Sequence, residues 1–130
     1  MKIFNTFALI HLLVLSGVCA AEGPANGAQQ EISHLFAYLE SSACQFSRNG
    51  SWYTPQEAVD HLNEKYQYLL GKNRIASAED FIAGAASKSS MSGMPYLVKC
   101  GNAAPVESAS WFRAELEKYR KTAPKVSSKP

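Results

Sequence analysis

Two cysteines, Cys44 and Cys100, limit the possible folds of this chain more than any other pair of residues. The third cysteine, Cys19, lies in an N-terminal segment that resembles a signal peptide. Removing that segment leaves an even pair in an exported chain, and such a pair forms a disulfide in an oxidising compartment. Closing the loop between Cys44 and Cys100 reduces the entropy of the unfolded chain and so stabilises the fold by roughly 4 kcal/mol. The sequence therefore predicts a structural Cys44–Cys100 disulfide.

Residues 1–20 have the pattern of a cleavable signal peptide. Lys2 precedes an apolar run from Ile3 to Leu15, which is shorter than the about 20 residues that a membrane-spanning helix needs. Val18 and Ala20 suit the positions that a signal peptidase reads, so cleavage is predicted after Ala20. The residues before Cys19 fit a lipoprotein signal poorly, and an uncleaved membrane anchor is the other alternative. We expect a periplasmic protein whose mature form has no transmembrane segment.

Length and charge bound the organisation and exclude one class of partner. The 130 residues fit one domain, predicted over 30–121 between a flexible lead-in (21–29) and a disordered tail (122–130). The formal net charge is only +2, and phosphate-backbone binding needs a concentrated basic face. Nucleic acid is therefore not expected as a partner.

Apolar residues at helical spacing predict four amphipathic helices, over about 30–41, 55–70, 77–87 and from 108 onward. The second opens with a capping box of Thr54 and Glu57, carries Pro55 in its first turn, and is expected to end at Gly71. Asn49-Gly50 predicts a type I′ hairpin turn within residues 44–53, and residues 96–100 read as a strand. The predicted fold class is α+β, with about four helices packed on a small antiparallel sheet (the hairpin plus one later strand).

A set of motifs spread over the mature chain has a familiar combination. It comprises Phe46-Ser47-Arg48-Asn49-Gly50, Glu57-Ala58-Val59, His61-Leu62, Lys65, Ala78-Glu79-Asp80-Phe81-Ile82 and the run from Ala86 to Lys99. This combination resembles the YfeK-like family of small exported Gram-negative proteins, a domain family of unknown function. The resemblance covers roughly Glu31 to Trp111 and implies export to a bacterial periplasm. It implies no activity and no catalytic residues.

Glu57, His61 and Lys65 lie on one flank of the second predicted helix, at spacings of four residues. A carboxylate one turn before an imidazole can orient it, which gives a candidate general acid–base element, and the cations give a candidate anion site. The alternative is an ordinary helix face, in which Glu57 is a cap and the Lys65 stem packs beside Tyr66.

Two loops supply the remaining binding candidates. Arg48 and Asn49 lie at the predicted hairpin turn, where an arginine fork can clamp a carboxylate or phosphate. The serine-rich loop before the last strand could cradle an anionic or glycan ligand, or cap the helix before it. Its candidate residues are Ser87, Ser89, Ser90 and Ser92.

A zinc site would need His34 and His61 to meet, and both remaining cysteines are assigned to each other; no metal or cofactor is predicted. We expect a non-catalytic binding module for an envelope protein or an anionic or glycan envelope component.

Three alternatives stay open. One is a small envelope-acting hydrolase that uses His61 with Glu57. Another is an inhibitor of a peptidoglycan-cleaving enzyme, since Ser92-Gly93-Met94-Pro95-Tyr96 resembles the inserted loop of some periplasmic lysozyme inhibitors. The last is a structural subunit anchored by Trp52, Tyr53 and Trp111.

Overall fold

The structure is a computed structural model that describes residues 25–123. The predicted signal peptide, residues 21–24 of the lead-in and residues 124–130 of the tail lie outside the described residues. Four helices and a four-stranded antiparallel sheet confirm the α+β class. The elements in chain order are α1 (Asn26–Ser41), β1 (Cys44–Arg48), β2 (Ser51–Tyr53), α2 (Pro55–Gly71), α3 (Ala78–Ala85), β3 (Leu97–Cys100), β4 (Val106–Glu107) and α4 (Ser108–Thr122).

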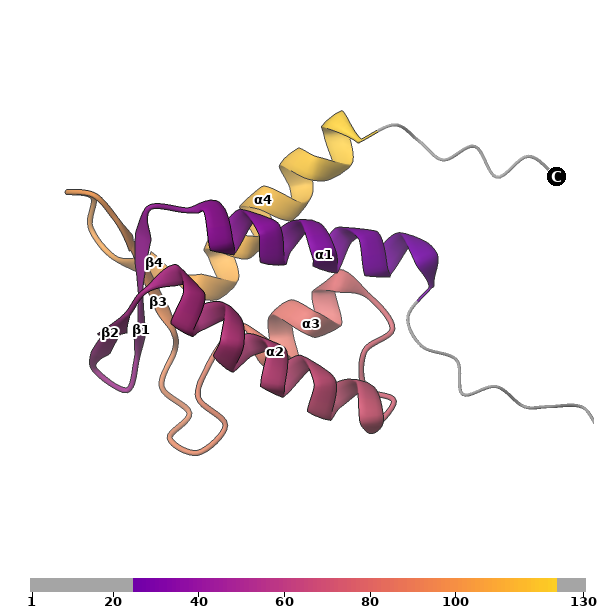
Figure 1. Cartoon of the computed structure of the whole chain (residues 1–130), viewed down its shortest axis with the longest axis horizontal. Helices are drawn as coiled ribbons and strands as arrows, with labels where there is room; N and C mark the ends of the chain where they lie inside the picture. The colour runs from indigo at the N-terminus through magenta and orange to yellow at the C-terminus, as the bar shows by residue number, and fades with distance from the viewer. Residues whose placement is uncertain (1–24, 124–130) are drawn as a thin grey trace, which may run out of the picture.

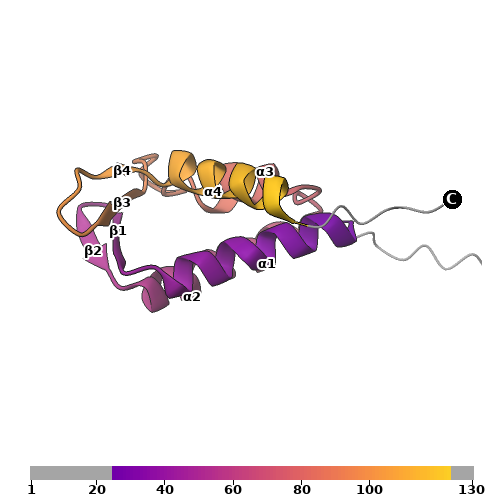
Figure 2. The same cartoon turned by 90° about the horizontal axis from the view of Figure 1, so that it is seen from above.

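The sheet lies at one end of the molecule, and the helices extend away from it (Figures 1 and 2). Its strand order is β2-β1-β3-β4. Cys44 faces Cys100 in the β1–β3 register, and the predicted disulfide joins them. The crosslink therefore fixes the middle of the sheet, next to the hairpin formed by β1 and β2.

The hairpin turn confirms the expectation for Asn49-Gly50. Both residues have positive φ, 51° and 82°, as a type I′ turn requires. Strand β4 was not predicted, because it has two exposed residues and so lacks the alternation that marks a strand.

Helix α2 has the predicted bounds, but the residue that turns the chain after it differs from the prediction. The Thr54 hydroxyl accepts the Glu57 N–H while the Glu57 carboxylate accepts the Thr54 N–H, which completes the capping box. The helix ends at Gly71 as predicted, but Gly71 keeps a helical conformation and is not the cap: Lys72 is the C-cap, and Asn73 takes the left-handed conformation with φ 53°. Asparagine tolerates this region, so the left-handed residue lies two positions after the glycine that was expected to take that conformation.

The core is formed by one face of each helix and the inner side chains of the sheet. Its buried side chains include those of Ile32, Leu35 and Leu39 in α1, Phe81 and Ile82 in α3, Phe112 in α4 and Val98 in β3.

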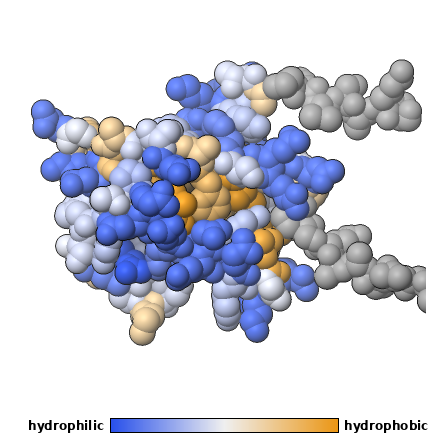
Figure 3. All heavy atoms as spheres, in the orientation of Figure 1, coloured by the Kyte–Doolittle hydropathy of each residue, from blue (hydrophilic) through white to orange (hydrophobic). Residues whose placement is uncertain are grey.

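Helix α1 starts at Asn26 rather than Gln30, because its first turn lies before the apolar stripe and carries no sequence signal. On the face seen in Figure 3, apolar surface gathers near the middle and hydrophilic side chains surround it. None of the helices described within residues 25–123 is both long and apolar enough to cross a membrane.

Candidate binding site

Three elements bring four polar side chains together at the sheet end of the molecule. Arg48 is the last residue of β1, and His61 and Lys65 lie one turn apart on α2, which packs against β1. Tyr96 directly precedes β3, the other neighbour of β1. We call Arg48, His61, Lys65 and Tyr96 the cationic cluster.

Hydrogen bonds within the cationic cluster define the proton positions on His61. The Arg48 Nη1 atom lies 2.7 Å from His61 Nδ1 and 3.3 Å from Nε2; a guanidinium can only donate, and the shorter contact assigns Nδ1 as the acceptor. Nδ1 is therefore the unprotonated nitrogen, and the proton sits on Nε2, which donates to the Tyr96 hydroxyl at 3.0 Å. The Lys65 ammonium donates to the same hydroxyl at 3.1 Å and to the Lys88 carbonyl at 2.8 Å. The imidazole is thus held in its neutral form.

The surroundings of the cluster disfavour further positive charge. Burial lowers the pKa of His61, the Arg48 and Lys65 charges lower it further, and Glu64 opposes them. Burial and the Arg48 charge likewise lower the pKa of Lys65. Burial raises the pKa of the Tyr96 hydroxyl, which keeps it protonated. Two fixed cations thus lie beside a neutral imidazole and a neutral phenol.

Among residues 25–123, neither Arg48 nor Lys65 forms an ion pair with a carboxylate. Glu57, expected to orient His61, instead directs its carboxylate to the Thr54 N–H and hydroxyl. Within the same part of the chain, Nη1 is the only guanidinium nitrogen of Arg48 with a hydrogen-bond acceptor. The cluster therefore presents donors and positive charge to its open side.

Two hollows adjoin the cationic cluster. The first has a volume of about 150 Å³ and a mainly apolar lining that includes Phe46, Tyr53, Ala58 and Leu62. The second, about 460 Å³, is more open and is bordered by Asn49, Lys65, Ser89 and Ser90. Arg48, His61 and Tyr96 line both hollows, so these three side chains lie between a smaller apolar pocket and a larger, more open hollow.

The loop between α3 and β3 packs against the hairpin turn, as its position beside β1 and β2 in Figure 1 indicates. Ser92 donates to the Asn49 side-chain oxygen, and Ser89 accepts the Ser92 N–H, so these two serines hold the loop in place. Ser87 donates to the Ile82 carbonyl at the end of α3 and does not border either hollow. Of the four serine candidates, Ser89 and Ser90 border the site.

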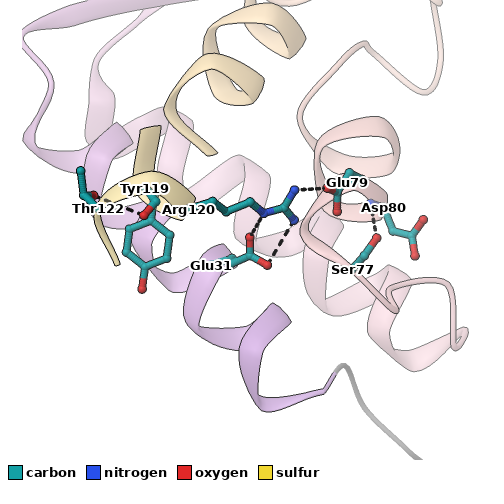
Figure 4. Close-up of polar contacts among 7 residues, drawn as sticks. All are labelled: Glu31, Ser77, Glu79, Asp80, Tyr119, Arg120 and Thr122. Atoms are coloured by element: carbon teal, nitrogen blue, oxygen red, sulfur yellow. Dashed lines mark hydrogen bonds and ion pairs between the residues drawn. The ribbon is translucent and has the colours of Figure 1, made fainter. Parts of the chain in front are cut away.

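His34 lies in a different cluster. Its Nε2 atom is 2.8 Å from a Glu115 carboxylate oxygen, and its ring stacks on Tyr119. At the same end of the helices, Arg120 of α4 lies between Glu31 of α1 and Glu79 of α3 and bonds both carboxylates (Figure 4). No group of three or more histidine, cysteine or acidic side chains that could hold a metal occurs within residues 25–123.

Sequence reasoning missed two members of the site, Tyr96 and Tyr53. Tyr96 is 6% exposed and its hydroxyl accepts from both His61 and Lys65. The Arg48 guanidinium lies 5.2 Å from the centre of the Tyr53 ring, over its face. A tyrosine at a strand end can place its hydroxyl beside a polar group, but only packing shows which group that is.

Comparison with known proteins gives relatives without an assigned activity. The sequence model of a family described as "Family of unknown function (DUF5329)" matches residues 26–120. The uncharacterized protein YfeK of Salmonella typhimurium (strain LT2) is 45% identical over 64 residues, which are 48% of this chain and 50% of that protein. The matched part thus spans about half the length of this curated relative. No solved structure matches the chain.

Proposed function

Because the chain belongs to the DUF5329 family of unknown function, as its YfeK-like motifs indicated, we propose a function from the geometry of its site alone. The protein is a non-catalytic binding module that holds an anionic group of an envelope ligand at the cationic cluster. One observation carries this proposal: Arg48 and Lys65 converge without a carboxylate partner among residues 25–123. Two unpaired cations in a partly desolvated hollow attract an anion more strongly than cations on an open surface do.

The donors available to an anion support the same proposal. The Arg48 atoms Nη2 and Nε have no acceptor among the described residues, and they form one edge of a planar fork that matches a carboxylate or phosphate. The Tyr96 hydroxyl accepts from His61 and Lys65, which leaves its own proton to donate. An anion at this position would receive hydrogen bonds from two elements of the fold.

The hydrolase alternative receives less support from the same contacts. A general base needs a ring nitrogen that is free to take a proton from substrate or water. Both nitrogens of His61 already have partners, and Glu57 caps its own helix. The inhibitor alternative also receives less support, because Tyr96 of the resembling loop motif is 6% exposed and cannot enter another protein's cleft as it stands.

A two-dimensional NMR titration of the mature chain tests the binding proposal. Sodium acetate and inorganic phosphate are the probes, and the variants are Arg48→Gln and Arg113→Gln, the latter at an exposed arginine of α4. We expect saturable shifts at the cluster, an affinity at least tenfold lower in Arg48→Gln, and an unchanged affinity in Arg113→Gln. Equal affinities in both variants, with both shown to be folded by their melting curves, would contradict the proposal.

We further propose that the protein works in the periplasm after cleavage behind Ala20. The signal-like pattern of residues 1–20 and the Cys44–Cys100 disulfide, which is compatible with export, support this. Mass spectrometry of the protein from a periplasmic extract should find an N-terminus at Ala21. A chain that starts at Met1 and stays in the cytoplasmic fraction would contradict it.

A further inference from the structure

The apolar pocket beside the cationic cluster adds a second requirement to the ligand. We infer that the bound anion is a carboxylate joined to an apolar group about the size of a benzene ring. The carboxylate meets Arg48, and the apolar group enters the pocket between α2 and the β1–β2 hairpin. This inference rests on the proposed anion-binding function and specifies the class of ligand.

The size and lining of the pocket define the apolar group. Its volume is about 150 Å³. An engineered apolar protein cavity of about 150 Å³ binds benzene, so one phenyl ring or one branched aliphatic side chain fits. Phe46 lies on its sheet side and Leu62 on its helix side, and both are buried. Such a lining favours an apolar occupant over water or a glycan hydroxyl.

The position of the pocket defines how the two parts of the ligand are connected. Arg48, His61 and Tyr96 border both the apolar pocket and the more open hollow. A carboxylate held by Arg48 therefore lies at the boundary, and its apolar group needs only a short link to enter the pocket. Because the apolar walls exclude water near the guanidinium, they also strengthen its attraction for the carboxylate.

Ala58 provides a way to close the pocket without touching the charges. It lies on α2 one turn before Leu62 and is half-buried against the pocket. Leucine favours a helix, so Ala58→Leu adds volume to the pocket at little cost to the helix. Ala114→Leu places the same change at an exposed position of α4 and is the matched control.

The experiment measures calorimetric affinities of the mature protein for three probes: acetate, phenylacetate and the neutral phenylacetamide. We expect phenylacetate to bind at least tenfold more tightly than acetate and phenylacetamide to bind more weakly than phenylacetate. Ala58→Leu should remove the advantage of phenylacetate while keeping the affinity for acetate, and Ala114→Leu should behave as wild type. Nuclear Overhauser contacts from the phenyl protons to Phe46 in the wild-type protein check the same placement without a variant.

The outcomes separate this inference from the proposal beneath it. Equal affinities for acetate and phenylacetate, both lost in Arg48→Gln, would overturn the apolar requirement and leave anion binding standing. Phenylacetate binding without dependence on Arg48 would overturn both. The tripeptide Gly-Gly-Phe and its C-terminal amide then distinguish the sources: tight binding of the free tripeptide alone assigns a peptide C-terminus, and tighter phenylacetate binding assigns a free acid.

Discussion

Arg48 and Arg120 lie at opposite ends of the molecule, and each connects elements that are distant in sequence, but their partners differ. Arg120 bonds the carboxylates of Glu31 and Glu79 and so ties α4 to α1 and α3 (Figure 4). Arg48 donates to the neutral imidazole of His61 and lies beside a second cation, Lys65. An arginine whose charge is neutralised within the fold stabilises it, whereas one that meets only neutral acceptors keeps its charge available for a ligand.

The pKa shifts around Arg120 and around Arg48 differ in the same way as their partners do. Hydrogen bonds from Arg120 lower the pKa of Glu79, and Glu31 and Glu79 raise the pKa of Arg120, so Arg120 and Glu79 each favour the charged form of the other. In the cationic cluster, by contrast, burial and the Arg48 charge lower the pKa of Lys65. Like charges held together cost the fold stability, and proteins accept such costs at functional sites.

The largest expected effect comes from removing the disulfide at the sheet end of the molecule, where the cationic cluster lies. Replacing both Cys44 and Cys100 by serine should lower the free energy of unfolding by roughly 4 kcal/mol, because the unfolded chain regains the conformational entropy that the crosslink removes. Denaturant titration of the oxidised protein and the double variant measures this. A difference below about 1 kcal/mol would show that the sheet end does not depend on the crosslink.

The second effect tests directly, by ligand binding, whether Arg48 differs in role from Arg120. Arg48→Gln should weaken acetate binding by about 10- to 100-fold, which corresponds to the roughly 1.5–3 kcal/mol of a hydrogen bond to a charged group. Its melting temperature should stay within about 2 °C of wild type, because the repulsion with Lys65 disappears together with the bond to His61. A large fall in melting temperature would make Arg48 a structural residue like Arg120.

The third effect concerns Arg120, whose replacement should change stability and leave binding unchanged. Arg120→Gln should lower the free energy of unfolding by about 1 kcal/mol, since its two ion pairs are partly exposed and screened by solvent. This corresponds to a melting temperature lower by about 4–8 °C for a domain of this size. Acetate affinity should not change, and a lower affinity would remove the contrast between the two arginines.

The sequence predicted those parts of the fold whose signals are local. Asn49-Gly50 and the Thr54–Glu57 capping box each specify a conformation within four residues, and both are present. Strand β4 and the left-handed Asn73 after α2 were missed, because the first depends on pairing with β3 and the nearby Gly71 gave a competing signal for the second.

The sequence identified most residues of the candidate site but not that they lie together. Arg48, His61 and Lys65 come from a hairpin and a helix whose packing no local pattern specifies. Glu57 carried two competing signals, a cap for Thr54 and a partner for His61, and a single carboxylate serves the nearer backbone donor. Tyr96 was missed because its role depends on the packing of the loop before β3 against α2.

The smallest effect is the pH dependence of His61. Its pKa in the folded protein is lowered, mainly by burial and then by Arg48 and Lys65. The unfolded chain therefore takes up a proton at a higher pH than the folded chain, so the stability that the neutral imidazole contributes is present above about pH 6.5 and decreases as the pH falls. In His61→Gln this part of the acid dependence should disappear, which denaturant titrations between pH 7 and 5 measure.

An NMR titration of the His61 ring protons checks the sign and returns to the contrast between the two arginines. Without ligand, the midpoint should lie below the ordinary value of about 6.5, and a midpoint above it would contradict the arrangement of the cationic cluster. Saturating acetate should raise the midpoint, because a carboxylate bound to Arg48 offsets the charge that opposes protonation of His61. In effect the ligand would give Arg48 the carboxylate partner that Arg120 already has within the fold.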